Sequence, residues 1–146
     1  MRTFRFCICA LLFAFSTGYA QQPSPTTESV NLSGSWDVQL MDKHHKVIAT
    51  MTVSFSNQAA NSCMSGNWKQ VVVSKYQTGD TDFFPGGAPL AYALDGNHLT
   101  IGRVNVCDGY LMLEGEISGN RTQGEYSAVS MGEGGLLGYF EAKRNP

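Results

Sequence analysis

The side chains that most often carry out catalysis or hold metals are few in this chain and widely separated. It has three histidines among its 146 residues. His44 and His45 are adjacent, so on a strand they would point to opposite faces, and on a turn both would be exposed. His98 lies in another predicted turn, and no histidine or cysteine spacing matches a zinc site. A weak surface metal site at His44 and His45 is the alternative, and we favour a metal-free turn.

The acidic residues offer one further candidate for chemistry. Asp80 and Asp82, in "TGDTDFF", could be paired carboxylates for acid–base catalysis, although such a pair is more often part of a solvated loop. The chain has no G-x-S-x-G nucleophile elbow. "MGEGG" at 131–135 is not a phosphate loop, because no helix follows it and no lysine is placed to reach a phosphate. We therefore expect a protein that is not an enzyme and uses no cofactor or metal.

The first 20 residues have the organisation of a signal peptide. Two arginines precede an apolar run at 6–15, and Gly18 and Ala20 are small residues suited to signal-peptidase cleavage. The apolar run is shorter than the roughly 20 residues that a membrane span needs. The sequence therefore predicts an exported protein, periplasmic or extracellular, with no membrane span.

The residues after the signal peptide are polar. We interpret 21–31 as a flexible leader, because "QQPSPTTES" has no large apolar side chain whose burial could offset its ordering entropy. A single domain then covers 32–146. Without the two arginines of the signal peptide, eight basic and twelve acidic residues remain, a net charge of −4. This balance argues against nucleic acid as a partner.

Short runs rich in Val, Thr, Tyr, Phe and Trp alternate with turn residues along this domain, and no segment shows helical spacing over three turns. This pattern predicts an all-β fold. Short connections make neighbours in sequence neighbours in the sheet, and eight strands in up-and-down order would close, or nearly close, into an antiparallel barrel without free edges. The predicted strands are 34–41, 47–55, 66–76, 90–95, 99–106, 110–118, 122–130 and 136–144.

Two cysteines, Cys63 and Cys107, remain after the signal peptide. In an oxidising compartment such a pair predicts one disulfide, with two free thiols as the alternative. In a strict meander, however, Cys63 precedes the third strand and Cys107 follows the fifth, at opposite barrel ends, whereas a disulfide needs Cα atoms within about 7 Å. Either the segment 57–66 runs along the barrel wall, or the strand count is wrong by one, or the cysteines do not pair.

Four predicted strands carry a glycine two residues before an aromatic residue, beginning with Gly34 and Trp36 in "NLSGSWDVQL". "LSGSW" resembles the G-x-W signature of the calycin barrels, the lipocalin and avidin-like families. The resemblance implies that Trp36 closes the narrow end of the barrel and that Arg144, near the end of the last strand, lies across its indole in a cation–π contact. The resemblance covers most of residues 32–144, as a pattern of residue types rather than as sequence identity.

A second resemblance is to small periplasmic barrels that inhibit bacterial metalloproteases. They also open with an "LSGxW"-like strand and carry one disulfide, and they insert a flexible N-terminal segment into the protease cleft. Residues 21–31 would be the matching segment here. This resemblance implies a secreted protease, or another protein, as the partner.

The longest predicted connection, at 77–89, contains the adjacent Phe83 and Phe84. In an up-and-down barrel it lies at the end opposite Trp36, the expected open mouth. The two rings could form a lid over a ligand, a contact for a partner protein, or a plug folded back over the core. The residues expected to bind a ligand are Trp68, Phe83, Phe84, Tyr92 and Tyr126.

Three functions follow from these observations, in order of preference. The first is binding of a small, mostly apolar ligand inside the barrel. The second is protease inhibition or protein docking through the leader or the mouth loops, and the third is an enzyme of unknown class. The interior volume separates the first two, because a small-molecule pocket needs at least roughly 300 Å³ and a filled core favours the second.

Overall fold

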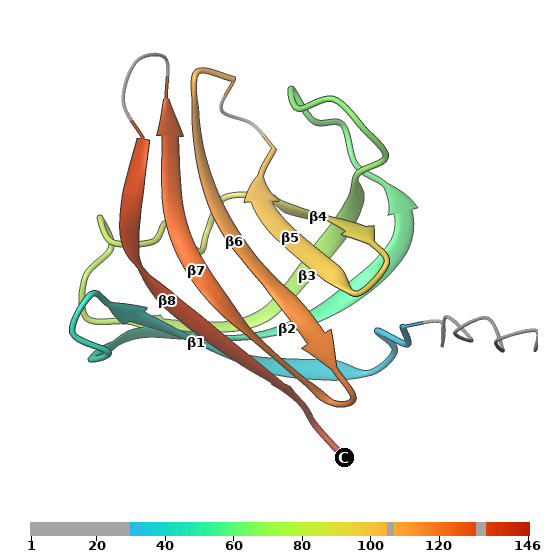
Figure 1. Ribbon diagram of the computed structural model, residues 1–146, viewed down its shortest axis with the longest axis horizontal. Helices are drawn as coiled ribbons and strands as arrows, with labels where there is room; N and C mark the ends of the chain where they lie inside the picture. Colours follow the sequence, from blue (N-terminus) through green and yellow to red (C-terminus); the bar gives the residue numbers. More distant parts are fainter. Residues whose placement is uncertain (1–29, 105–106, 131–133) are drawn as a thin grey trace, which may run out of the picture.

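Eight antiparallel strands make up the regular structure of this protein. The computed structural model describes residues 30–104, 107–130 and 134–146; the expected signal peptide and residues 21–29 of the expected leader lie outside these ranges. The strands hydrogen-bond in chain order and close between the first and the last, which confirms the predicted all-β up-and-down barrel (Figure 1). Their bounds are β1 (Ser35–Asp42), β2 (Val47–Ala59), β3 (Lys69–Thr78), β4 (Leu90–Asp95), β5 (His98–Arg103), β6 (Gly109–Ser118), β7 (Arg121–Ser130) and β8 (Gly134–Arg144).

Alternation along the strands divides inward from outward side chains. On β1, Trp36, Val38 and Leu40 are buried, whereas Asp37 and Gln39 between them are exposed. Side chains from all eight strands meet inside and fill the barrel, as expected for one of this size. The main core consists of Trp36, Val38, Leu40, Ala49, Met51, Val53, Val71, Phe84, Leu90, Tyr92, Leu99, Ile101, Leu113, Ile117, Tyr126, Phe140 and Ala142.

Several glycines lie where neighbouring strands crowd each other, Gly124 and Gly138 among them. A Cβ at Gly124 would collide with the carbonyl oxygen of Glu114, and one at Gly138 with that of Met41. The absent side chains let β6, β7, β8 and β1 curve tightly. Tyr126 and Phe140, two residues further along their strands, are both fully buried in the interior, as the glycine–aromatic pattern predicts for β7 and β8.

The strands differ from prediction most between the second and the third. β2 extends to Ala59, four residues further than predicted, and β3 begins at Lys69, three residues later than predicted. Between them, residues 60–68 form a loop whose base is closed by a hydrogen bond from the Ala60 N–H to the Trp68 carbonyl (2.9 Å). Trp68 therefore precedes β3 instead of lying within it. We call residues 60–68 the strap.

The strap packs against the outside of the barrel. On β4, Leu90 and Tyr92 face the main core, so that Ala91 between them faces outward. Trp68 packs over Ala91 and Val104 in a separate apolar cluster. The other members of this cluster are Ala60, Met64 and Ala93.

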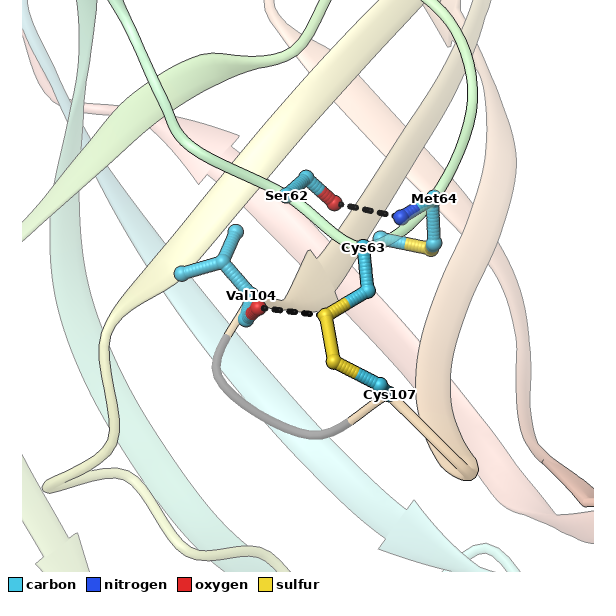
Figure 2. The surroundings of a disulfide bond; sticks show 5 residues. All are labelled: Ser62, Cys63, Met64, Val104 and Cys107. Carbon is cyan, nitrogen blue, oxygen red and sulfur yellow. Dashed lines mark hydrogen bonds between the residues drawn. A yellow bond between two sulfur atoms is a disulfide. The ribbon is translucent and has the colours of Figure 1, made fainter.

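The strap carries Cys63, which is bonded to Cys107 in the connection between β5 and β6, with their Cα atoms 5.2 Å apart (Figure 2). The predicted disulfide is thus confirmed, and of the three alternatives the segment along the barrel wall is correct. The strands are staggered: Lys69 pairs with Tyr92, which in turn pairs with Ile101, so the base of the strap lies beside the middle of β4 and β5. From the middle of these strands, the strap can extend along the barrel wall to the far end of β5.

Candidate functional site

The connection between β3 and β4 folds into the mouth of the barrel. Phe84 is only 1% exposed, and its ring packs edge to face on Tyr126 with the centroids 5.7 Å apart. The ring of Phe83, which is half-buried, packs on the same tyrosine at 5.2 Å. The Tyr76 hydroxyl donates a hydrogen bond to the Phe84 carbonyl. In this structure the connection therefore closes the mouth as a plug.

Tyr126 holds the plug through its hydroxyl as well as its ring. The hydroxyl donates a hydrogen bond to the Phe83 carbonyl. Burial raises the pKa of Tyr126 to about 12, with a smaller lowering by the Arg103 charge and a smaller raising by Tyr76. The hydroxyl therefore keeps its proton at neutral pH and stays a hydrogen-bond donor.

Asp80 shapes the same connection. One of its carboxylate oxygens accepts hydrogen bonds from the backbone N–H groups of Asp82 (2.9 Å) and Phe83 (3.2 Å). This is the local side-chain-to-backbone pattern of an aspartate turn. Both aspartates are exposed, so they occupy the solvated loop that the sequence offered as the alternative to a catalytic pair.

The opposite end of the barrel, which we call the floor, is closed by Trp36 and Arg144. Trp36 is fully buried, and the guanidinium carbon of Arg144 lies 5.1 Å from its ring centroid. The Trp36 indole N–H donates to the Leu32 carbonyl (3.3 Å), and the Arg144 guanidinium donates to the Asn31 carbonyl. These two contacts fix residues 30–33 across the floor.

Gly34 lets the chain turn from this segment into β1. Its φ is +86°, in the region that favours glycine, and a Cβ there would lie 3.9 Å from the Arg144 side chain. The glycine of the G-x-W pattern therefore has a backbone role at the floor.

An open hollow of about 580 Å³, the floor hollow, lies between residues 30–33 and the ends of β2, β3 and β4. Its inner wall is aromatic: the Phe55 ring packs edge to face on Trp36 (5.9 Å) and on Tyr92 (5.0 Å). Leu94, which also lines the hollow, is 38% exposed. The lining residues are Val30, Asn31, Leu32, Ser33, Phe55, Asn57, Asn67, Lys69, Tyr92 and Leu94.

The five residues expected to bind a ligand do not meet in one pocket. Phe83, Phe84 and Tyr126 lie together at the mouth, Tyr92 lies beside the floor hollow, and Trp68 lies outside the barrel in the strap. The sequence analysis assigned residues 30 and 31 to the leader, and it did not single out Leu32, Ser33 or Phe55 as parts of a site. Leu32, an apolar residue two positions before Gly34 of the G-x-W motif, was the available signal for the segment that crosses the floor.

The paired histidines lie on the turn between β1 and β2, where both are exposed. The His45 ring stacks on Tyr139 with the centroids 4.3 Å apart, and the His44 N–H donates to the Asp42 carboxylate (2.8 Å). Hydrogen bonds from the backbone N–H groups of Lys46 and His44 lower the pKa of Asp42. Across residues 30–104, 107–130 and 134–146, no three His, Cys, Asp or Glu side chains are grouped to hold a metal ion.

A search of the described residues for a helix long and apolar enough to cross a membrane found none. Comparisons with protein-family models, with curated proteins and with solved structures found no match to this chain.

Proposed function

We propose that this protein is an exported, non-enzymatic, calycin-like barrel that binds another protein, a secreted protease in the first instance, through its floor. The observation that carries the proposal is the filled interior. Phe84 and the inward side chains of all eight strands occupy the space in which a lipocalin-type ligand would sit. A filled core favours the second of the functions expected from the sequence over internal ligand binding.

The floor supports the calycin-like part of the proposal. Trp36 pairs directly with Arg144 across β1 and β8, and the guanidinium lies over the indole. This is the arrangement that the resemblance implied for the narrow end of the barrel. The closed eight-stranded meander agrees with it.

The floor also has the chemistry of a protein contact. Its hollow combines an aromatic wall and the exposed Leu94 with the polar side chains of Asn57, Asn67 and Lys69. An apolar centre with polar groups around it is the usual composition of an interface between proteins. Residues 30–33 are fixed beside this hollow by Trp36 and Arg144, so the chain that precedes them starts from the floor.

In the proposed mode, residues 21–29 enter the substrate cleft of the protease while the floor hollow takes a side chain from the cleft rim. The two prolines and the short polar side chains of "QQPSPTTES" suit an extended segment in such a cleft. The non-enzymatic part of the proposal is supported by the separation of the titratable side chains, since His44 and His45 lie on a turn and Asp80 shapes a loop.

The test measures inhibition of purified secreted metalloproteases, and of serine proteases for comparison, by the chain from residue 21 onward. We expect inhibition that weakens at least about tenfold when residues 21–29 are removed, because their contacts with the cleft are lost. Leu94→Asp should also weaken it, because a charge would enter the apolar centre of the contact.

Val129→Asp is the matched control, because Val129 is a similarly exposed valine (44%) that does not line the floor hollow. It should leave inhibition unchanged. Inhibition that survives both the truncation and Leu94→Asp would exclude the floor, and the absence of both inhibition and complex formation with every protease would contradict the proposed function.

A further inference from the structure

The disulfide joins two connections that lie outside the barrel. Cys63 belongs to the strap and Cys107 to the connection between β5 and β6, and neither lies in a strand. Both cysteines are exposed to solvent. An exposed disulfide can be approached by a thiol in solution, whereas a buried one is protected.

The bond also holds the tip of the strap, residues 61–67, in place. Within the described ranges, the hydrogen bonds of the tip stay inside the strap: the Met64 N–H donates to the Ser62 hydroxyl (3.1 Å), and the Trp68 indole donates to the Ser65 carbonyl (3.0 Å). Toward the barrel wall, Figure 2 shows the Cys63 sulfur near the Val104 carbonyl oxygen, at 3.8 Å. Polar contacts alone therefore do not fix the tip to the wall.

The remaining contact of the tip is apolar and small. The end of the Met64 side chain lies over Gly102, 3.2 Å from where a Cβ would stand. Met64 also packs in the outer cluster with Val104, Ala91 and Ala93. One half-buried methionine contributes limited apolar area, so the packing of the tip gives limited stabilisation without the covalent bond.

The barrel itself does not depend on the strap. Its eight strands form an unbroken ring of hydrogen-bonded pairs, and its main core contains no residue of 60–68. At the base of the strap, the Ala60–Trp68 hydrogen bond and the buried Trp68 ring are independent of the disulfide.

From these observations we propose that Cys63–Cys107 is a site of reversible thiol–disulfide exchange with a dithiol, and that opening it frees the strap tip while the barrel stays closed. A thiolate of the dithiol attacks one of the two sulfur atoms, the S–S bond breaks, and the other cysteine leaves as a thiolate. The second thiol of the dithiol resolves the mixed disulfide. Two electrons and two protons pass from the dithiol, which becomes a disulfide, to Cys63 and Cys107, which become thiols.

Opening the bond lets the Met64 side chain leave Gly102 and so uncovers the outer wall there, while Trp68 stays over Ala91. This inference does not rest on the proposed floor interface. Asn67 of the strap tip lines the floor hollow, but counting thiols and following hydrogen exchange tests the disulfide without any protease, so the two proposals can fail separately. The consequence of opening the bond is a surface on the outer wall that is exposed only in the reduced protein.

The experiment treats the oxidised protein with dithiothreitol without denaturant. Alkylation with iodoacetamide and intact mass count the free thiols, and hydrogen exchange read by mass spectrometry follows each segment. We expect both cysteines to be alkylated, exchange in residues 61–67 to rise at least about tenfold, and the protected amides of β6 and β7 to change less than about threefold. Oxidised dithiothreitol should restore the original pattern.

Two variants separate the bond from the packing. Cys63→Ser with Cys107→Ser should reproduce the exchange of the reduced protein without any reductant. Met64→Ser, in the oxidised protein, should raise exchange in the tip far less than reduction does, because the bond still holds the tip.

Three results would each overturn the inference. The cysteines could react only after unfolding, which would make the bond inaccessible. The reduced protein could exchange residues 61–67 as slowly as the oxidised one, which would mean that packing holds the tip. Reduction could also remove protection throughout the barrel, which would make the bond a support of the whole fold.

Discussion

Trp36 and Arg144 meet because the register between β1 and β8 sets them directly opposite each other. Replacing Trp36 by alanine should lower the free energy of unfolding by roughly 3–5 kcal/mol, since it removes a fully buried ring from the core. Arg144→Ala should lower the free energy of unfolding less, because it removes only the guanidinium over the indole and the hydrogen bond to the Asn31 carbonyl. Urea denaturation measures both.

Trp68→Ala is the control for the loss of a tryptophan as such. Trp68 packs in the small outer cluster rather than in the main core, so its loss should cost less than that of Trp36. Equal costs at the two positions would mean that Trp36 does not have the role at the floor described here.

Tyr126 makes the stability of the barrel depend on pH at the alkaline end. Its pKa is about 12 in the folded protein against 10.0 for an unperturbed tyrosine, so the folded state holds the phenolic proton more tightly than the unfolded one. The free energy of unfolding is therefore unaffected below pH ~9 and falls as the pH rises, by about 1 kcal/mol at pH ~11. Chemical denaturation at a series of pH values measures this slope.

Tyr126→Phe should remove that part of the slope, at the cost of about 1 kcal/mol for the lost hydrogen bond to Phe83. Burial also raises the pKa of Tyr92, so Tyr92→Phe is the control for the contribution of the other buried phenol. An unchanged slope in Tyr126→Phe would contradict the raised pKa.

Residues on regular strands were the ones whose places the sequence could predict. Alternation places Trp36 and Phe140 inside, and the resemblance to the calycin barrels implies the place of Arg144 across Trp36. Trp68 follows a glycine in the same pattern, but it precedes β3 and packs outside the barrel. Its direction depends on the strap, a loop for which periodicity gives no information.

At the scale of elements, the connection between β3 and β4 is the one whose role the sequence left open. Phe84→Ser should lower the free energy of unfolding by at least about 3 kcal/mol, because the ring is buried in the core and a hydroxyl would replace it. Phe83→Ser should cost about 1–2 kcal/mol, because that ring is only half-buried. Thermal or urea denaturation of the two single variants measures the difference.

The two phenylalanines serve as controls for each other, since they are adjacent in one connection and differ in burial. If Phe84→Ser were as stable as the unchanged protein, the ring would not be a plug, and the lid and protein-contact hypotheses would return. A large loss at Phe83 with none at Phe84 would mean that the two rings have exchanged places.

The strap could have been located from the sequence by a signal that strand prediction does not use. The fourth strand reads "LAYALD", apolar at five consecutive positions, whereas β1 alternates apolar and polar residues. A strand that is apolar on both faces is covered on both faces. Ala91, fully buried on the outer side, therefore signals that something packs there, and Cys63 and Cys107 indicate which segment.

For the whole molecule, the barrel and its strand order followed from the spacing of strands and turns, but the state of its interior did not. Periodicity identifies which strand residues face inward. Whether they leave a cavity depends on side-chain volumes and on loops that enter from outside the pattern. Here Phe84, a loop residue, completes the core at the mouth.

The filled interior leads to a prediction for the molecule as a whole. The unchanged protein should not be stabilised by small apolar compounds such as benzene or indole, because Phe84 and the inward side chains of all eight strands pack together in one core. Phe84→Ala should remove one ring from the core and leave an apolar cavity of about that size, which such compounds can occupy. A ligand that binds only the folded state stabilises that state. Indole should therefore raise the melting temperature of the Phe84→Ala variant and leave that of the unchanged protein as it was.

Circular dichroism first establishes that Phe84→Ala keeps its strands, since Phe→Ala in a core costs roughly 3–5 kcal/mol. Phe83→Ala is the matched control, because it removes the same atoms from a half-buried position and should gain no stabilisation from indole. Stabilisation of the unchanged protein by indole would show that the barrel holds an internal pocket after all. That result would restore internal ligand binding as the leading function and would weaken the case for the floor as the binding surface.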